Sequence, residues 1–422
     1  MDRVLICTVG GSLAPIRSAV RARRTKHLLL LATAEGGPDR QGSRAEAQAL
    51  ADELKSAAGI AEVAILPADD PDAAGVLCRD HVARLRRQYP RAEIVCDYTG
   101  GTKSMSAALM LACIADPEAR VTLQLMRGER HNLDRVTDGT ERPVRIEVDA
   151  LLADRLLERA DRAWRNFGYA EAALLLADAR DNLEHAEAVP ASLRTRLVTA
   201  HAASLAFAAW DRFDHAAALA AWSAIPGPAR QRLAPFEKGL RSLTGASQDR
   251  VPLALLDLWN NALRRAARGQ HDDAVARCYR AVEWSAQWVL KTQKGIDTAR
   301  VSRSEIGPVL FDKFARGVIR STTLKIGLDQ ALECVRTLLP QHPLTQALGR
   351  KGQRSDALTD LTAWKEMRNH SILAHGFEPI GAAGWATVEA WMTRNWLPWL
   401  TAEATDRSLS LPQLPQRLQD HG

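Results

Sequence analysis

Hydrophobic and polar positions follow two regimes along the chain, with a change near residue 150. Before that point, short apolar runs predict strands over residues 4–9, 27–33, 63–67, 92–98 and 121–127. The first four are almost continuously apolar, which is typical of strands covered on both faces. Polar, helix-forming stretches such as 43–58 and 72–89 separate them. This alternation predicts an α/β, Rossmann-like first domain with a doubly wound sheet. A hairpin is expected after it, with a turn near Asp138-Gly139 and a return strand over 144–148.

After residue 150 a 3.6-residue period takes over, alanine and leucine dominate, and all 11 tryptophans occur, beginning with Trp164. The pattern Ala-Trp-x-x-Phe-x-x-Ala occurs at 163–170 and again at 209–216, 46 residues later. Two copies at this spacing indicate repeated helical hairpins. Chance recurrence in an alanine-rich helical region is the alternative.

Breakers at 225–228 and 244–249 place a domain boundary near 250. Residues 251–400 are again helical in pattern, with loops around 294–301 and 342–355, and the tail after Thr401 is expected to pack loosely. The predicted domains are therefore 1–150, an all-α linker over 151–250, and an all-α domain over 251–422.

Composition limits the class of protein. The 422 residues carry a net charge of +6, which is compatible with a polyanionic partner. Six cysteines lie in apolar runs without Cys-x-x-Cys spacing, as expected for free thiols of a cytoplasmic protein. No apolar run approaches the roughly 20 residues that span a bilayer, and the first residues read as a strand rather than a signal peptide. We therefore expect a soluble, cytoplasmic chain with no membrane partner.

The first candidate site is Asp97-Tyr-Thr-Gly-Gly-Thr-Lys-Ser104, between a predicted strand and a predicted helix over 105–115. Such a turn offers free backbone N–H groups and the positive end of a helix dipole, which suit a phosphate or another anion. A nucleotide-hydrolysing P-loop is excluded, because Thr102 stands where that motif requires glycine before Lys103. A plain strand-to-helix turn with a capping threonine is equally compatible with these residues.

The second candidate is the pair Arg368 and His375, which carry the guanidinium and imidazole that metal-free RNA cleavage requires. If one helix holds both, they share a face about 10 Å apart along the axis, which favours a site combined from two chains. Six of the 11 histidines follow an arginine with four to six residues between, so only the context, Arg-Asn before and Gly376 after, singles this pair out. His370 is five residues from His375 rather than four, and no metal is assigned.

A third stretch, 269–284, is an amphipathic helix with an acidic start. We interpret Arg277 as part of a surface ion pair. Arg280 and Glu283 are three residues apart and could support an active-site groove.

Together these segments resemble the CARF–HEPN ribonucleases of type III CRISPR systems, in the branch with a helical insert. Residues 7–16 resemble the first-strand loop of CARF domains, and 97–104 resemble their fourth-strand signature. Residues 368–375 match the HEPN motif, and 272–283 are similar to the first HEPN helix. Residues 151–250 carry little of the resemblance.

The resemblance implies a Rossmann-like sensor for cyclic tetra- or hexa-adenylate across a homodimer axis, and a metal-independent endoribonuclease in antiviral defence that cuts single-stranded RNA and leaves a 2′,3′-cyclic phosphate. No cofactor is implied. Catalysis would fall to Arg368 and His375, with Asn369 orienting them. The ligand contacts would be Gly10, Gly11, Ser12, Thr99, Gly100, Gly101, Thr102 and Lys103.

Two alternatives remain open. The HEPN domain could have lost cleavage and serve as a dimerisation or binding module, although Arg368 and His375 are both intact. The sensor could also degrade its own cyclic ligand. Incubation with labelled RNA and cyclic oligoadenylates in the presence of a chelator distinguishes these readings.

Overall fold

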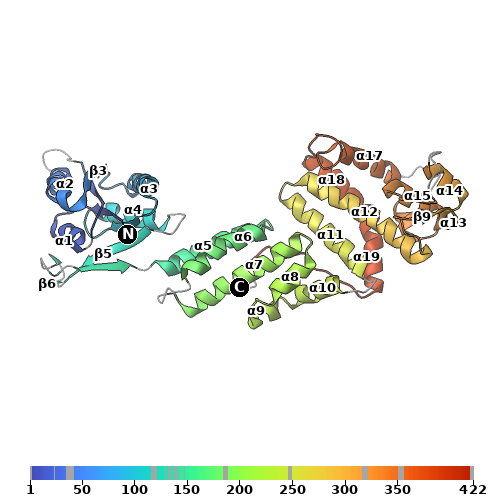
Figure 1. Ribbon diagram of the computed structural model, residues 1–422, viewed down its shortest axis with the longest axis horizontal. Helices are drawn as coiled ribbons and strands as arrows, with labels where there is room; N and C mark the ends of the chain where they lie inside the picture. The colour runs from blue at the N-terminus through green and yellow to red at the C-terminus, as the bar shows by residue number, and fades with distance from the viewer. Residues whose placement is uncertain are drawn as a thin grey trace. The chain divides into compact units, whose positions relative to one another are not determined.

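The structure is a computed structural model that describes residues 2–22, 24–34, 42–115, 121–128, 130–131, 135–136, 140, 142–146, 148–183, 189–245, 250–315, 322–349 and 356–418. It divides into two compact units. The first comprises Met1–Arg155 with His185–Pro190, and the second comprises Leu156–Glu184 with Ala191–Gly422. Figure 1 shows the elements of both.

The α/β region and the helix that follows it run β1 (Arg3–Thr8), α1 (Ala14–Ala22), β2 (His27–Thr33), α2 (Arg44–Ala58), β3 (Ile60–Leu66), α3 (Pro71–Gln88), β4 (Glu93–Asp97), α4 (Lys103–Ile114), β5 (Val121–Arg127), β6 (Arg130–His131), β7 (Arg135–Val136), β8 (Arg142–Ile146) and α5 (Asp149–Arg165).

The remaining elements run α6 (Tyr169–Leu183), α7 (Ala191–Asp211), α8 (His215–Trp222), α9 (Gly227–Arg232), α10 (Ala234–Thr244), α11 (Arg250–Ala267), α12 (His271–Lys294), β9 (Val301–Ser302), α13 (Arg303–Ile306), α14 (Pro308–Ala315), β10 (Thr323–Leu324), α15 (Leu328–Leu338), α16 (Pro343–Ala347), α17 (Asp356–His370), α18 (Ala382–Trp391), a π-helical turn (Met392–Trp396) and α19 (Leu397–Asp406).

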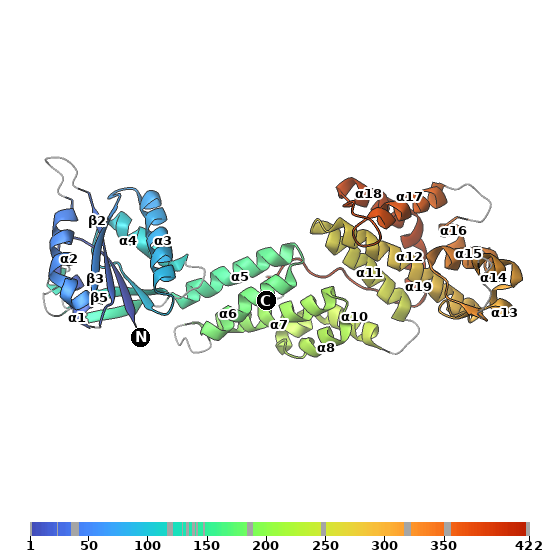
Figure 2. The same cartoon turned by 45° about the horizontal axis from the view of Figure 1, so that its top comes forward.

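Within the described residues, six strands form one sheet in the order β3-β2-β1-β4-β5-β8. All neighbours are parallel except β8, which runs antiparallel to β5. Successive residues of a strand point to opposite faces. Leu5 therefore packs with α1 and α2, whereas Ile6 packs with α3 and α4. Figure 2 shows these helix pairs on the two faces. The predicted Rossmann-like fold is confirmed.

The predicted strands agree with the observed ones within a few residues at their ends. The first four strands are covered on both faces, as expected. In β3, Ala61, Val63 and Ile65 pack on one face, and Ala64 and Leu66 pack on the other. Most β3 residues are only half-buried because the strand ends the sheet and, among the described strands, pairs with β2 alone. The return strand is present as β8, while the turn near Asp138-Gly139 lies outside the described residues.

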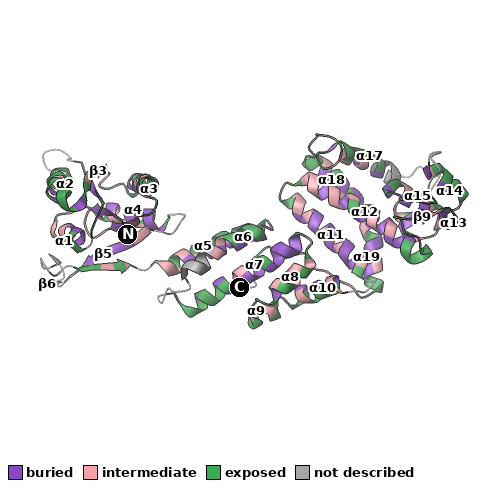
Figure 3. Ribbon diagram, in the orientation of Figure 1, coloured by how far each residue is buried: buried purple, intermediate pink, exposed green. Residues whose placement is uncertain are grey.

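The two sequence repeats form the same helix–turn–helix corner, as predicted. The amide of Gly168 donates to the carbonyl of Ala163 at 2.8 Å, and the amide of Asp214 donates to the carbonyl of Ala209 at 3.0 Å. In both corners the phenylalanine has a positive φ, 54° at Phe167 and 66° at Phe213. These are the bonds and the left-handed residue of a Schellman helix end. Figure 3 shows the run of buried residues along α7.

A third corner of this kind joins α11 to α12. Here the amide of Gln270 donates a hydrogen bond to the carbonyl of Arg265 at 2.9 Å, and the left-handed residue is Gly269, with φ of 72°. The sequence pattern missed this corner because neither the tryptophan nor the phenylalanine is present.

A buried charge network joins α7, α8 and α11. The guanidinium of Arg264, 0% exposed, donates to the carboxylate of Asp211 at 2.8 Å. Asp257, 1% exposed, accepts from the indole of Trp210 at 3.1 Å and contacts the imidazole of His215 at 2.7 Å. Charges removed from water are tolerated only when paired in this way.

The expectation of a loosely packed C-terminal tail is wrong. Leu414 and Leu418 are 2% and 4% exposed. The hydroxyl of Tyr169 donates to the carbonyl of Pro415 at 2.8 Å, and the amide of Leu418 donates to the carboxylate of Asp161 at 2.9 Å. Two spaced leucines and main-chain bonds therefore anchor a segment whose composition alone suggested a free end.

Across the described ranges, no helix combines the length and the apolar character that crossing a bilayer requires. All six cysteines are buried free thiols.

Candidate functional site

The loops after β1 and β4 meet at the carboxyl edge of the sheet. The two strands are parallel neighbours, and the chain continues from β1 toward β2 on one side and from β4 toward β5 on the other. Ligands of doubly wound folds bind at such a switch point. The hydroxyl of Thr8 donates to the carbonyl of Gly100 at 2.6 Å and holds the loops together.

Glycines allow these loops to approach so closely. A Cβ on Gly10 would lie 2.6 Å from the amide nitrogen of Gly101, and one on Gly100 would lie 2.6 Å from the carbonyl oxygen of Thr8. Gly101 also has φ of 82°, in the left-handed region. By contrast, a Cβ on Gly11 would meet open space.

The hydroxyls of the turn are engaged within the fold. Thr102 caps α4, accepting from the amide of Met105 at 3.2 Å and donating to the carbonyl of Ala68 at 2.6 Å. Thr99 donates to the carboxylate of Asp97 and accepts from the amide of Met126 at 2.8 Å. These two threonines shape the turn rather than present free hydroxyls.

Asp97, at the end of β4, is the charged residue beneath this turn. Burial raises the pKa of its carboxyl, against hydrogen bonds from Thr99 and Gln124 that lower it. The carboxylate accepts from the amide of Thr99 at 3.0 Å and from the side chain of Gln124 at 2.7 Å. It therefore fixes the turn that leads to α4.

A pocket of about 420 Å³ opens beside the two loops. Of the predicted contacts, Gly10, Gly11, Gly101 and Thr102 line it. Ser12, Thr99, Gly100 and Lys103 are not among its lining residues, although Ser12 and Lys103 are exposed close by in sequence. The predicted contacts stay predictions.

Sequence reasoning missed the far wall of this pocket, which includes Thr33, Ser43 and Glu46. Thr33 ends β2, the other neighbour of β1, so its place at the same edge follows from the strand order. The amide of Thr33 donates to the hydroxyl of Ser43, and the amide of Ser43 donates back to the hydroxyl of Thr33, both at 3.0 Å. This reciprocal pair joins the end of β2 to the start of α2.

The second candidate site differs from its prediction. Arg368 and His375 do not share one helix, because α17 ends at His370. The chain then turns back, and the amide of His375 donates to the carbonyl of Asn369 at 3.2 Å. The predicted separation of about 10 Å along one helix axis is therefore wrong, and so is the argument for a two-chain site that rested on it.

Gly376 permits this turn. A Cβ at that position would lie 1.9 Å from the carbonyl oxygen of His370 and 2.3 Å from its carbon. The glycine that singled out the motif in the sequence is therefore required by a close backbone contact.

Arg368 is held from α12. Its guanidinium lies over the ring of Tyr279, 4.4 Å from the centroid, and donates to the side-chain oxygen of Asn369 at 3.3 Å. Its Nε is buried and has no hydrogen-bond partner among the described residues. His375 is exposed. The arrangement presents a fixed cation and an accessible imidazole on one turn of chain.

Tyr279 and Glu283 extend this site along α12. Burial, and next the charge of Glu283, raise the pKa of the Tyr279 phenol. Glu283 pairs with Arg280 at 2.7 Å, and Arg277 pairs with Asp273 at 2.6 Å. The Arg280–Glu283 pair has the three-residue spacing noted in the sequence, and the Asp273–Arg277 pair is the surface ion pair expected of Arg277. No cluster of three or more metal-ligating side chains occurs within the described ranges.

Comparisons with known proteins give one family match and a structural match to Csm6. Residues 243–395 match the family model of the Csm6 HEPN domain. Csm6 from Enterococcus italicus, solved bound to cyclic hexa-2′-fluoro-hexa-dAMP, is similar with a TM-score of 0.56 at 14% identity, over 96% of this chain and 95% of that one.

Can2 from Sulfobacillus thermosulfidooxidans, solved with cyclic tetra-adenylate, gives a TM-score of 0.24 at 14% identity, over 51% of this chain and 66% of that one. No curated protein sequence matches the chain. The comparisons therefore show a Csm6-type HEPN domain over residues 243–395 and, over nearly the whole chain, a fold shared with Csm6.

Proposed function

We propose that the chain is a single-stranded RNA endoribonuclease of antiviral defence, which acts without a metal and is activated by a cyclic oligoadenylate bound at the N-terminal pocket. The observation that carries this proposal is the end of α17 with the turn that follows it, since Arg368 lies in the last turn of the helix and His375 in the turn after it, both inside the region matched by the Csm6 HEPN model. The Arg–Tyr279 contact fixes the cation before substrate arrives.

The proposed reaction is an internal transfer at a phosphate. The 2′-oxygen of one ribose attacks the adjacent phosphorus, the bond from phosphorus to the 5′-oxygen breaks, and the products are a 2′,3′-cyclic phosphate and a 5′-hydroxyl. Arg368 stabilises the charge on the pentavalent intermediate. The 2′-hydroxyl loses a proton and the leaving 5′-oxygen gains one; His375 makes one of these two transfers and solvent water makes the other. Asn369 orients Arg368 through their hydrogen bond.

At the sensor, the amides of the glycine loops and the first turn of α4 would meet the phosphates of the cyclic ligand. The binding of a cyclic hexanucleotide analogue by the Enterococcus italicus protein of the same fold supports this assignment. Titration with cyclic tetra-adenylate and cyclic hexa-adenylate distinguishes the two possible ring sizes of the ligand. A ring of like nucleotides has rotational symmetry, so a homodimer offers it the same loops twice.

The chain is proposed to act in the cytoplasm. All six cysteines are buried, free thiols, which is the form that a reducing compartment maintains.

The test is cleavage of a 5′-labelled single-stranded RNA with each cyclic oligoadenylate in turn, with EDTA present. His375→Ala should cut about 100- to 10,000-fold more slowly, the range expected when a general acid or base is removed. His370→Ala is the matched control, because His370 is also exposed and ends α17. Unchanged cleavage by His375→Ala, or loss of wild-type cleavage in EDTA, contradicts the proposal.

A further inference from the structure

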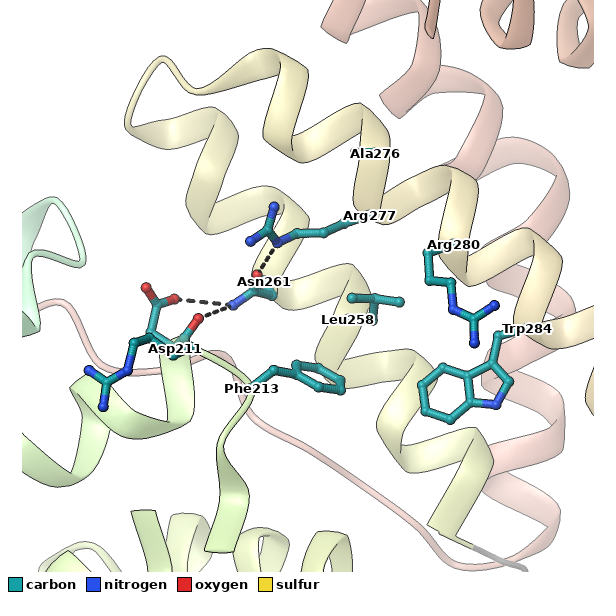
Figure 4. Close-up of a pocket in the computed structure, with 9 residues that line it drawn as sticks. Asp211, Phe213, Leu258, Asn261, Ala276, Arg277, Arg280 and Trp284 are labelled. Atoms are coloured by element: carbon teal, nitrogen blue, oxygen red, sulfur yellow. Dashed lines mark hydrogen bonds between the residues drawn. The ribbon is translucent and has the colours of Figure 1, made fainter. Parts of the chain in front are cut away.

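A second pocket, of about 360 Å³, lies between α11, α12 and the turn that follows α7. Figure 4 shows Phe213 and Trp284 on opposite sides of it, with Leu258 between them. Arg212, Arg277 and Arg280 also line it. No residue of the turn after α17 belongs to its lining. We propose that this pocket is a subsite for one nucleotide of single-stranded RNA, its base between Phe213 and Trp284 and its phosphates at the arginines.

The aromatic walls suit a base. Unpaired bases are commonly held against aromatic rings and arginine planes, and this stacking tolerates any sequence. The guanidinium of Arg280 lies 5.7 Å from the ring centroid of Trp284, so a cation already extends that wall. A flat ring entering from solvent would find an apolar floor at Leu258, which is 8% exposed.

The two phenylalanine corners place their side chains differently. Phe213 and Phe167 occupy the same position of the same turn, with φ of 66° and 54°. Phe167 is 6% exposed and packs near Tyr169, with 6.4 Å between ring centroids. Phe213 is only half-buried and lines the pocket. The first corner therefore buries Phe167 in the core, whereas the second leaves Phe213 partly accessible to solvent.

The charges favour a phosphate over an acidic or apolar peptide. Arg212 is exposed and makes no side-chain hydrogen bond or ion pair in the part of the chain that the structure describes. Arg277 and Arg280 pair with exposed or half-buried acids on their own helix. The acidic lining residue, Asp211, is buried and neutralised by Arg264 and Arg265 at 2.8 and 2.6 Å.

Position relates the pocket to the proposed nuclease site, on which this inference rests. Tyr279, under the guanidinium of Arg368, is the direct neighbour of Arg280 in α12. Glu283 pairs with Arg280, and its charge also raises the pKa of Tyr279. An RNA with one phosphate at Arg368 can therefore pass around α12 and place a nearby nucleotide in the pocket.

The first test measures RNA affinity in the His375→Ala protein, which should bind without cutting, by anisotropy of a fluorescein-labelled single-stranded RNA with activator at saturation. Adding Trp284→Ala should weaken binding about 5- to 100-fold, the effect typical of one lost stacking partner. Trp284→Phe should restore most of it, and Arg280→Ala should weaken binding and flatten its salt dependence. Arg303→Ala, which breaks an exposed ion pair with Asp312, should change nothing.

The second test does not depend on a folded Trp284 variant. A series of short RNAs carries a single abasic nucleotide at successive positions. The His375→Ala protein should bind one member of this series more weakly than the others. That positional loss should shrink in Phe213→Ala. In the proteins that retain His375, Arg280→Ala should raise KM while leaving kcat nearly unchanged.

Three outcomes overturn the pocket assignment alone: unchanged RNA affinity in both Arg280→Ala and Trp284→Ala, a loss of activator affinity instead of RNA affinity, or a changed oligomeric mass in light scattering, which would mean that the pocket seats a second copy. If the His375→Ala protein binds no RNA under any condition, the nuclease proposal fails together with the subsite.

Discussion

Replacing Gly376 by alanine should uncouple cleavage from folding. The added Cβ would lie 1.9 Å from the carbonyl oxygen of His370, where an ordinary contact is about 3.4 Å or more. The obstacle is backbone, so the turn itself has to move by about 1.5 Å. That movement strains two hydrogen bonds. One runs from the amide of His375 to the carbonyl of Asn369, and the other from the amide of Gly376 to the carbonyl of Ser371 at 3.3 Å.

The magnitude follows from geometry. Misplacement of a catalytic group by about 1 Å can cost about 100-fold in rate, so Gly376→Ala should cut RNA at least about 100-fold more slowly. Two weakened main-chain bonds should lower stability by only about 1–3 kcal/mol. Affinity for the cyclic ligand should not change, because the sensor pocket lies in the other unit.

The assay compares single-turnover cleavage, ligand titration and thermal unfolding for Gly376→Ala and Gly381→Ala. Gly381 lies five residues later, and a Cβ there meets nothing within 4 Å. It begins α18 as the N-cap, where alanine should cost at most about 1 kcal/mol. Wild-type cleavage by Gly376→Ala, or equal losses in both variants, would refute the reasoning that this turn positions His375.

Two further changes test other parts of the molecule. Lys103→Ala, at the exposed start of α4, should raise the activator concentration for half-maximal cleavage while the rate at saturation stays nearly constant, and normal activation would remove Lys103 from the sensor. Asp211→Ala should lower the free energy of unfolding by about 3–5 kcal/mol in urea, because it removes the nearest carboxylate from the buried Arg264 and leaves it only the more distant Asp257, whereas Asp312→Ala on the exposed pair should cost at most about 1 kcal/mol. Equal costs would contradict the role given to burial.

Much of the fold could be predicted because local chemistry decides it. Apolar runs in the first third pair as parallel strands, and the recurrent Ala-Trp-x-x-Phe pattern marks two helix corners of identical backbone. Gly100 and Gly101 belong to the predicted turn and Gly10 to the predicted first-strand loop, and each lies at a contact or a φ that a side chain would obstruct or strain. Such positions are readable in a sequence because only glycine satisfies them.

The errors share one cause, which is that contacts between distant segments are invisible in local pattern. Helical spacing suggested one helix from Arg368 to His375, but the chain turns after His370, where Gly376 can approach the helix end. The tail looked free until Leu414 and Leu418 met the helical unit.

The sequence alone therefore determined the class of each domain, the glycine loops and the identity of the arginine–histidine pair, since these depend on residue type and short spacing. Tertiary structure decided which side chains share a pocket. Thr33 and Ser43 line one pocket with the glycine loops through strand order, and Tyr279 meets Arg368 across 89 positions of chain. Phe213 lies opposite Trp284 for the same reason, because packing of helices brings together residues whose separation in sequence carries no signal.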